Sequence, residues 1–131
     1  MIENISPPNW NTRAPVTQAK KIDLGNCYMI LVSGIQTPAG PDKVVYTHDV
    51  AEQTRQVYEE IKQSLELSGA TFDHVVKAVI YLADIKDFSI VSSIRAEYFS
   101  ESKPVSTLVG GVSFTRTGTK VEIEITAILP K

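Results

Sequence analysis

The sequence is poor in the residues that build metal sites and disulfides. It has a single cysteine, Cys27, and two histidines among 131 residues. One cysteine excludes an intrachain disulfide and is typical of a reducing compartment. His48 and His74 have no cysteine or acidic cluster at ligand spacing, so we interpret them as surface residues and expect no metal. Cys27, which has no base nearby in the sequence, is interpreted as a small core residue.

Long apolar runs, a signal-peptide pattern and an excess of one charge are also missing. No apolar stretch reaches the length that spans a membrane, and the first residues, MIENISPPNW, do not resemble a secretory signal. The net charge of −2 gives no electrostatic reason to bind nucleic acid or an anionic membrane. We therefore expect a cytoplasmic protein that binds neither.

What is present is the composition of one globular domain. Hydrophobic residues make up 43% of the chain and charged residues 21%, which is ordinary for a folded domain. The length of 131 residues suits one domain with its own hydrophobic core. The sequence shows no linker or low-complexity tract, so we treat residues 1–131 as a single domain.

The last part of the chain has the clearest pattern. Residues 105–114 and 120–129 are predicted to form two strands of a hairpin, joined by a Gly-containing turn. In the second strand Val121, Ile123 and the following odd-numbered positions share one face, and Glu122 and Glu124 lie on the other. Two carboxylates on a strand of this kind need water, a partner or a ligand.

The rest of the chain completes an α+β pattern. Residues 1–16 are predicted to be an irregular arm, because Pro and Asn recur in it. Strands are expected at 18–24, 27–32 and 75–82, with Gly25-Asn26 as a hairpin turn, and helices at 49–67 and 88–99. The order is ββαβαββ, and we expect both helices to cover one face of the sheet.

The other face of this sheet carries apolar residues that two helices cannot cover. Val75, Val79 and Tyr81 are predicted to lie on it. Such a patch is unusual on a soluble monomer, so we expect a closed symmetric oligomer. Glu122 and Glu124 would then line clefts between the subunits.

Several segments together resemble one protein family. The sequence is similar to the RidA (YjgF-type) family of reactive-intermediate deaminases in DLGN at 23–26, VSG at 32–34, DVAEQTRQ at 49–56, VKAVIYL at 76–82 with Asp84 and DF at 87–88, and VEIE at 121–124 with Ala127. The resemblance covers almost the whole chain.

The resemblance implies a chorismate-mutase-like fold and a homotrimer with three clefts between subunits. It implies a small-molecule substrate and the hydrolysis of 2-imino acids and their enamine tautomers to 2-keto acids and ammonia, without a cofactor. A guanidinium fork suits the substrate carboxylate, and a Glu with a bound water suits general acid–base catalysis.

The functional residues of the family carry over only in part. Glu122 matches the catalytic Glu, but Ser106 stands where the family has its carboxylate-binding Arg, since the family's Pro-Ala-Arg-Ser/Thr reads PVST at 104–107 here. Val16 stands in place of a Tyr, and Ser92 in place of an Asn. The expected substrate-binding residues are Ser33, Gly34, Phe88, Ser92, Ser106, Thr107 and Val16.

These departures leave alternatives open. Arg95 shares a helix face with Phe88 and Ser92 and is a candidate anion-binding residue, and Arg116 is a second candidate. We expect either an imine or enamine deaminase of altered substrate range, or a trimer that holds a small metabolite without turnover. An endoribonuclease, a label some family members have carried, is the weakest alternative because the chain has no basic stripe.

Overall fold

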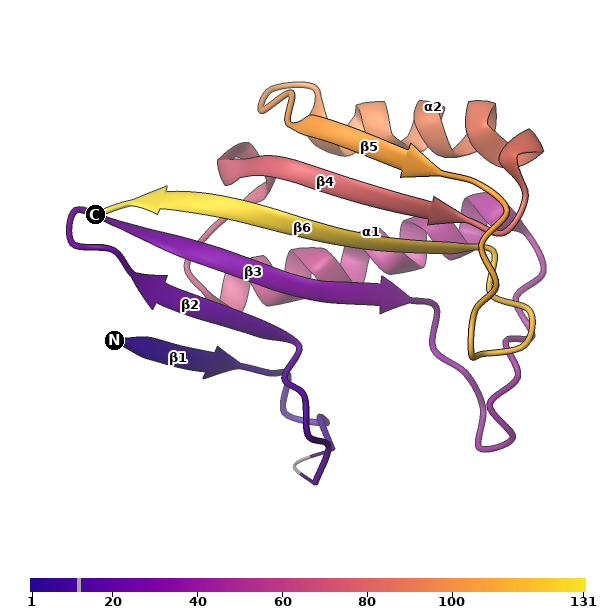
Figure 1. The fold of residues 1–131 in the computed structure, drawn as a ribbon, viewed down its shortest axis with the longest axis horizontal. Coiled ribbons are helices and arrows are strands. Elements are labelled where there is room, and N and C mark those ends of the chain that lie inside the picture. The colour runs from indigo at the N-terminus through magenta and orange to yellow at the C-terminus, as the bar shows by residue number, and fades with distance from the viewer. Residues whose placement is uncertain (12) are drawn as a thin grey trace.

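A computed structural model describes residues 1–11 and 13–131 of the chain. Figure 1 shows its strands and its two α-helices, and the chain also contains two short 3₁₀ helices, η1 (Phe72–His74) and η2 (Ile85–Asp87). The longer elements are β1 (Ile2–Ile5), β2 (Ala19–Asp23), β3 (Cys27–Gln36), α1 (Val50–Leu67), β4 (Val75–Leu82), α2 (Phe88–Phe99), β5 (Val105–Val109) and β6 (Val121–Pro130).

The strands form one mixed sheet in the order β1-β2-β3-β6-β4-β5. All neighbouring pairs are antiparallel except β4 and β5, which run parallel. Both helices lie behind the sheet in the view of Figure 1, and its front face is uncovered. The expected α+β sheet with both helices on one face is confirmed.

The predicted hairpin at the end of the chain is wrong. β6 lies between β3 and β4, and β5 pairs only with β4. β5 also ends at Val109 rather than near residue 114, because Gly110 passes close to Ile85 and Gly111 has a φ of 70°. An alternating pattern shows that a segment is a strand, but it does not say which strand is its neighbour.

The N-terminal arm is also more ordered than its prolines predict. Residues 2–5 form β1, which pairs with β2 through Ile2 opposite Ile22 and Ile5 opposite Ala19. The strand stops before Pro7 and Pro8, since proline has no N–H to donate to a sheet. An edge strand of four residues carries too short a pattern to be recognised among the prolines.

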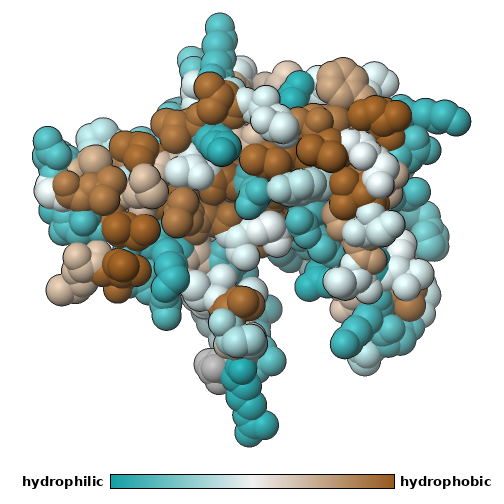
Figure 2. Space-filling model, viewed as in Figure 1, coloured by the Kyte–Doolittle hydropathy of each residue, from teal (hydrophilic) through white to brown (hydrophobic). Residues whose placement is uncertain are grey.

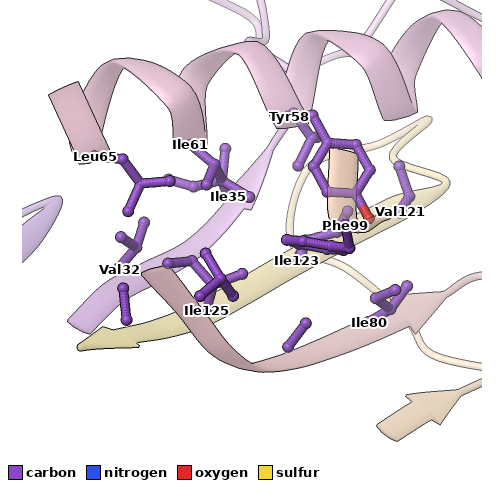
Figure 3. Close-up of a cluster of buried hydrophobic side chains, with 14 of the residues drawn as sticks. Val32, Ile35, Tyr58, Ile61, Leu65, Ile80, Phe99, Val121, Ile123 and Ile125 are labelled. Carbon is purple, nitrogen blue, oxygen red and sulfur yellow. The ribbon is translucent and has the colours of Figure 1, made fainter. Parts of the chain in front are cut away.

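The core lies between the helices and the sheet. Asp49 caps the N-terminus of α1, and its side chain accepts hydrogen bonds from the N–H groups of Ala51 and Glu52. Figure 3 shows side chains from α1, α2 and the central strands meeting in one apolar layer. The odd-numbered residues of β6 from Val121 to Ala127 are all buried, as predicted. Burial of each aliphatic side chain in this layer contributes roughly 1.5–3 kcal/mol to the stability of the folded state.

A β-bulge interrupts β3 near its end. Val32 lies opposite Ile125 and Ile35 opposite Ile123, so β3 has one residue more than β6 in this interval. Val32 and Ile35 are both buried, while Ser33 and Gly34 between them are exposed. The bulge resets the alternation and places Gln36 opposite Glu122.

The uncovered face of the sheet mixes apolar and polar side chains, as Figure 2 shows. Leu31, Val105 and Val109 are exposed by 39%, 70% and 41%. Such side chains on the face without helices support the expectation that another surface covers it. Val79 and Tyr81 lie on this face as predicted, but Val75 does not, because a register shift between Val75 and Lys77 turns it into the core. Cys27 is half-buried opposite Pro130 at the start of β3, so its prediction as a core residue is wrong. In the part of the chain that is described, neither helix is long and apolar enough to cross a membrane.

Candidate functional site

Glu122 is held at the beginning of β6 on the uncovered face. It lies opposite Gln36 of β3 on one side and opposite Tyr81 of β4 on the other. Gln36 Nε2 donates a hydrogen bond of 2.5 Å to Glu122 Oε1, and the carboxylate is half-buried. The amide donor fixes the orientation of the carboxylate. Lys77 lies opposite Thr126, so it does not face Glu122 across the sheet.

Gly34 lies against the same carboxylate. A β-carbon built on Gly34 would be 2.9 Å from both Cδ and Oε2 of Glu122. The bulge therefore brings bare backbone beside the acid, and the predicted pair Ser33-Gly34 does reach Glu122 through Gly34. A carboxylate held between an amide and a backbone segment is suited to general acid–base work on a small substrate.

Gln36 was not predicted, and it is supported by another residue that was not predicted. Thr119 Oγ1 donates to Gln36 Oε1 over 3.3 Å, which leaves Gln36 Nε2 directed at Glu122. The sequence has no motif for this contact, because the bulge in β3 decides that Gln36 rather than Ile35 faces Glu122.

Glu124 has a different partner. Tyr81 Oη donates a hydrogen bond of 2.9 Å to Glu124 Oε1. This bond, together with the carboxylate's negative charge, raises the pKa of Tyr81 above its ordinary value. The carboxylate of Glu124 is thus bonded to a tyrosine of the neighbouring strand. Glu122 is therefore the better candidate for the reacting acid.

A broad hollow of about 1100 Å³ lies between the N-terminal arm and the uncovered face. Val16 and Ser33 line it, together with Lys77, Val79 and Glu124. The side chain of Val16 is 61% exposed, and its carbonyl accepts a hydrogen bond from Trp10 Nε1 at 3.1 Å. The structure thus brings two of the predicted residues to the edge of one hollow near the bulge.

The other predicted residues gather where α2 meets β5. Arg95 Nη2 donates to Ser92 Oγ over 3.0 Å, and Arg95 Nη1 donates to Ser106 Oγ over 3.4 Å. Phe88, two turns before Arg95 on α2, is 44% exposed. Residues at positions 88, 92 and 95 share a helix face because they are four and three apart. We call Phe88, Ser92, Arg95 and Ser106 the α2–β5 cluster.

The α2–β5 cluster and Glu122 lie on opposite faces of one sheet. Ser106 is aligned with Ala78, which is buried under the helices, whereas Glu122 is aligned with Tyr81, three residues further along β4. Residues an odd number apart on a strand point to opposite faces. Thr107, aligned with Val79, faces the same side as Glu122. One chain alone therefore does not bring Glu122 and Arg95 into one cleft.

Arg116 and the two histidines lie outside both groups of site residues. Arg116 Nη1 donates a hydrogen bond of 2.8 Å to the carbonyl of Thr37, so it joins neither group. His74 Nδ1 accepts from the N–H of Thr71 at 3.0 Å, and His48 is exposed in a loop. Within residues 1–11 and 13–131, no three His, Cys, Asp or Glu side chains are grouped so that they could hold a metal ion.

Comparison with known proteins gives consistent matches over most of the chain. The sequence profile described as Endoribonuclease L-PSP matches residues 12–129. A RutC family protein of Pyrococcus abyssi is 40% identical over 118 residues, which are 89% of this chain and 87% of that protein. A 2-iminobutanoate/2-iminopropanoate deaminase of Escherichia coli is 34% identical over 107 residues, 82% of this chain and 81% of that enzyme. The crystal structure of YyfA, a Rid family protein of Yersinia pestis, superposes with a TM-score of 0.80 at 32% identity and covers 97% of this chain and 98% of that one.

Proposed function

This chain belongs to the endoribonuclease L-PSP family, also called the YjgF/RidA family, and from this membership we propose that it hydrolyses a reactive enamine or imine to a carbonyl product and ammonia. The chorismate-mutase-like α+β fold expected from the sequence is confirmed by the solved relatives. The deaminase relative supports the reaction class, and the single cysteine supports the cytoplasmic location that we propose.

The proposed reaction needs one group that moves protons. Water adds to the carbon of the C=N bond and loses a proton, and the nitrogen gains a proton. The resulting carbinolamine then breaks its C–N bond, so that ammonia leaves and a C=O bond forms. Glu122 would accept the proton of the attacking water and return it to the nitrogen. An iminium carbon is already electrophilic, so this chemistry calls for no metal or organic cofactor.

One observation carries the assignment of Glu122 as this acid–base. Its carboxylate is oriented by Gln36 at 2.5 Å and lies against the backbone of Gly34 on the uncovered face of the sheet. A buried or half-buried carboxylate with one amide donor and no basic side chain bonded to it keeps capacity to accept a proton. The salt bridges among the described residues join Arg55 to Glu97 and Lys131 to Asp23, so neither includes Glu122.

We propose that the cleft forms between copies of the chain in a homotrimer. The uncovered face of one copy would supply Glu122, Ser33, Gly34, Thr107 and Val16. The edge of the next copy would supply the α2–β5 cluster. The placement of the two groups on opposite faces supports this arrangement, as do the exposed apolar residues around them.

The substrate range is proposed to differ from that of the E. coli deaminase. Ser106 carries no charge, and Val16 offers no hydroxyl. Losing a hydrogen bond to a charged group costs on the order of 1.5–3 kcal/mol. The absence of charge at position 106 also favours a second candidate function, in which the cleft binds a small metabolite without turnover.

An imine-hydrolysis assay separates these two functions. We would generate 2-imino acids in place with an amino acid oxidase and measure how the protein competes with semicarbazide for them. We expect native protein to lower semicarbazone formation, Glu122→Gln to abolish this effect, and Glu124→Gln to retain most of it. Native protein that binds 2-oxo acids but leaves semicarbazone formation unchanged would favour the binding function.

A further inference from the structure

We propose that Arg95 is the cation that binds the carboxylate of the ligand, and that Ser92 and Ser106 hold its guanidinium in place. This inference rests on the proposed function and concerns a substrate that carries a carboxylate. It assigns the recognition of that carboxylate to a residue of α2 rather than to one of β5.

Arg95 has hydrogen-bonding capacity left over. A guanidinium has five N–H donors, and Arg95 makes side-chain hydrogen bonds to two hydroxyl oxygens, those of Ser92 and Ser106. The salt bridges among the described residues join Arg55 to Glu97 and Lys131 to Asp23, so none neutralises Arg95. A half-buried guanidinium with neutral partners is arranged to receive an anion.

A cluster of aromatic rings lies in the core near Arg95. Tyr58 is fully buried in this cluster with Phe72, Tyr98 and Phe99. Burial raises the pKa of Tyr58, and the positive charge of Arg95 acts in the opposite direction, so the field of Arg95 reaches this ring. An apolar backing leaves a charge less screened than it is in water. Phe88 adds an exposed apolar surface on the same helix face.

The contact between Arg95 and Ser106 gives the serine a structural role in the site. A short hydroxyl side chain lets the guanidinium of Arg95 reach β5, and it leaves free the space that a longer side chain would fill. Ser106 is therefore a positioning residue in this protein. Replacing it by arginine would set two guanidinium groups against each other and weaken the site, although it would restore the family pattern.

Direct binding measurements test this inference without relying on turnover. We would titrate the native assembly with 2-oxobutanoate, the 2-oxo acid that hydrolysis of 2-iminobutanoate yields, and with its neutral amide, using calorimetry. We expect Arg95→Gln to weaken binding of the acid by roughly ten- to a hundred-fold and to leave the amide unchanged. Arg55→Gln makes the same change of charge on α1 and should bind both compounds as native protein does.

Variants at Ser106 give a second and independent readout. We expect Ser106→Ala to weaken binding of 2-oxobutanoate less than Arg95→Gln does. Ser106→Arg should weaken this binding more than Ser106→Ala. In the double variant Arg95→Ser/Ser106→Arg the cation sits on the strand, and binding of the acid should recover. Melting temperature and assembly mass, measured for each variant, identify any that fail to fold.

Three results would overturn the inference. They are native protein that prefers the amide, Arg95→Gln that binds the acid as tightly as native protein, and Arg95→Gln that breaks up the assembly with no change in affinity. A different result would overturn the proposed function. Native protein that binds 2-oxobutanoate through Arg95 but does not hydrolyse imines would support the inference and overturn the catalysis.

Discussion

Gly34 and Glu122 lie so close that a β-carbon on Gly34 would be 2.9 Å from the carboxylate carbon. Real β-carbons do not approach other atoms to this distance, so any larger residue at position 34 must push Glu122 aside. The backbone of Gly34 is not in the left-handed region, so any residue could adopt its conformation. The role of glycine at this position is therefore to make room for the carboxylate.

Gly34→Ala tests this relationship directly. Because the contact is with the end of a flexible side chain, we expect the free energy of unfolding to change little. Displacing the acid should lower kcat/KM for imine hydrolysis by roughly ten- to a hundred-fold. Gly40→Ala, in the loop after β3, is the control and should leave kcat/KM as it is. Native activity in the alanine variant would show that the position of Glu122 is not critical.

Gln53 should be among the most important polar residues for stability. It is fully buried, its Nε2 donates to the carbonyls of Thr47 and Gly118 at 2.6 and 2.9 Å, and its Oε1 accepts from the N–H of Lys120 at 2.9 Å. Gln53→Met keeps the volume but leaves three backbone groups without partners. We expect a loss of about 3 kcal/mol in the free energy of unfolding by urea. Gln63→Met, on the exposed side of α1, should stay within about 0.5 kcal/mol of native protein.

Tyr58 should make the protein sensitive to alkali. Burial raises its pKa above the ordinary value of 10.0, so above that pH the unfolded chain releases a proton that the folded chain retains. Stability conferred by the neutral tyrosine is present below pH 10 and falls as the pH rises further. Tyr58→Phe should flatten this decline. Parallel slopes for native and variant protein above pH 10 would contradict the prediction.

The same variant should also be more stable at neutral pH. Tyr58 Oη is buried and has no hydrogen-bond partner among residues 1–11 and 13–131, and its ring stacks on Tyr98 with a centroid distance of 4.4 Å. Phenylalanine keeps the stacking and removes the unpartnered hydroxyl, which should add about 1 kcal/mol to the free energy of unfolding. Urea titration at pH 7 measures the change.

Mixing two inactive variants tests whether the cleft is shared between copies. Glu122→Gln retains Arg95, and Arg95→Gln retains Glu122. After the two are unfolded, mixed in equal amounts and refolded together, roughly a quarter of the clefts should contain both native residues. We expect activity to return in the mixture and not in either variant treated alone. A mixture without activity would mean that both residues act within one chain.

The sequence predicts what depends on local pattern and misses what depends on pairing between distant strands. The alternation in β6 correctly predicts its buried row, and the spacing of Phe88, Ser92 and Arg95 predicts their shared helix face. The position of β6 between β3 and β4 could not be predicted, because alternation does not identify neighbours. Gln36 was missed for the same reason, since its contact with Glu122 requires both this pairing and the bulge.

The bulge in β3 makes the length of this segment as important as its chemistry. If one residue between Val32 and Ile35 were deleted, the bulge would close, and Val32 and Ile35 would lie two residues apart and both keep facing the core. Gln36 would stay opposite Glu122, but the extra backbone that lies against the carboxylate at Gly34 would be lost. A related chain without the extra residue should therefore keep its core and the Gln36–Glu122 contact, and should differ in how closely the backbone approaches the acid.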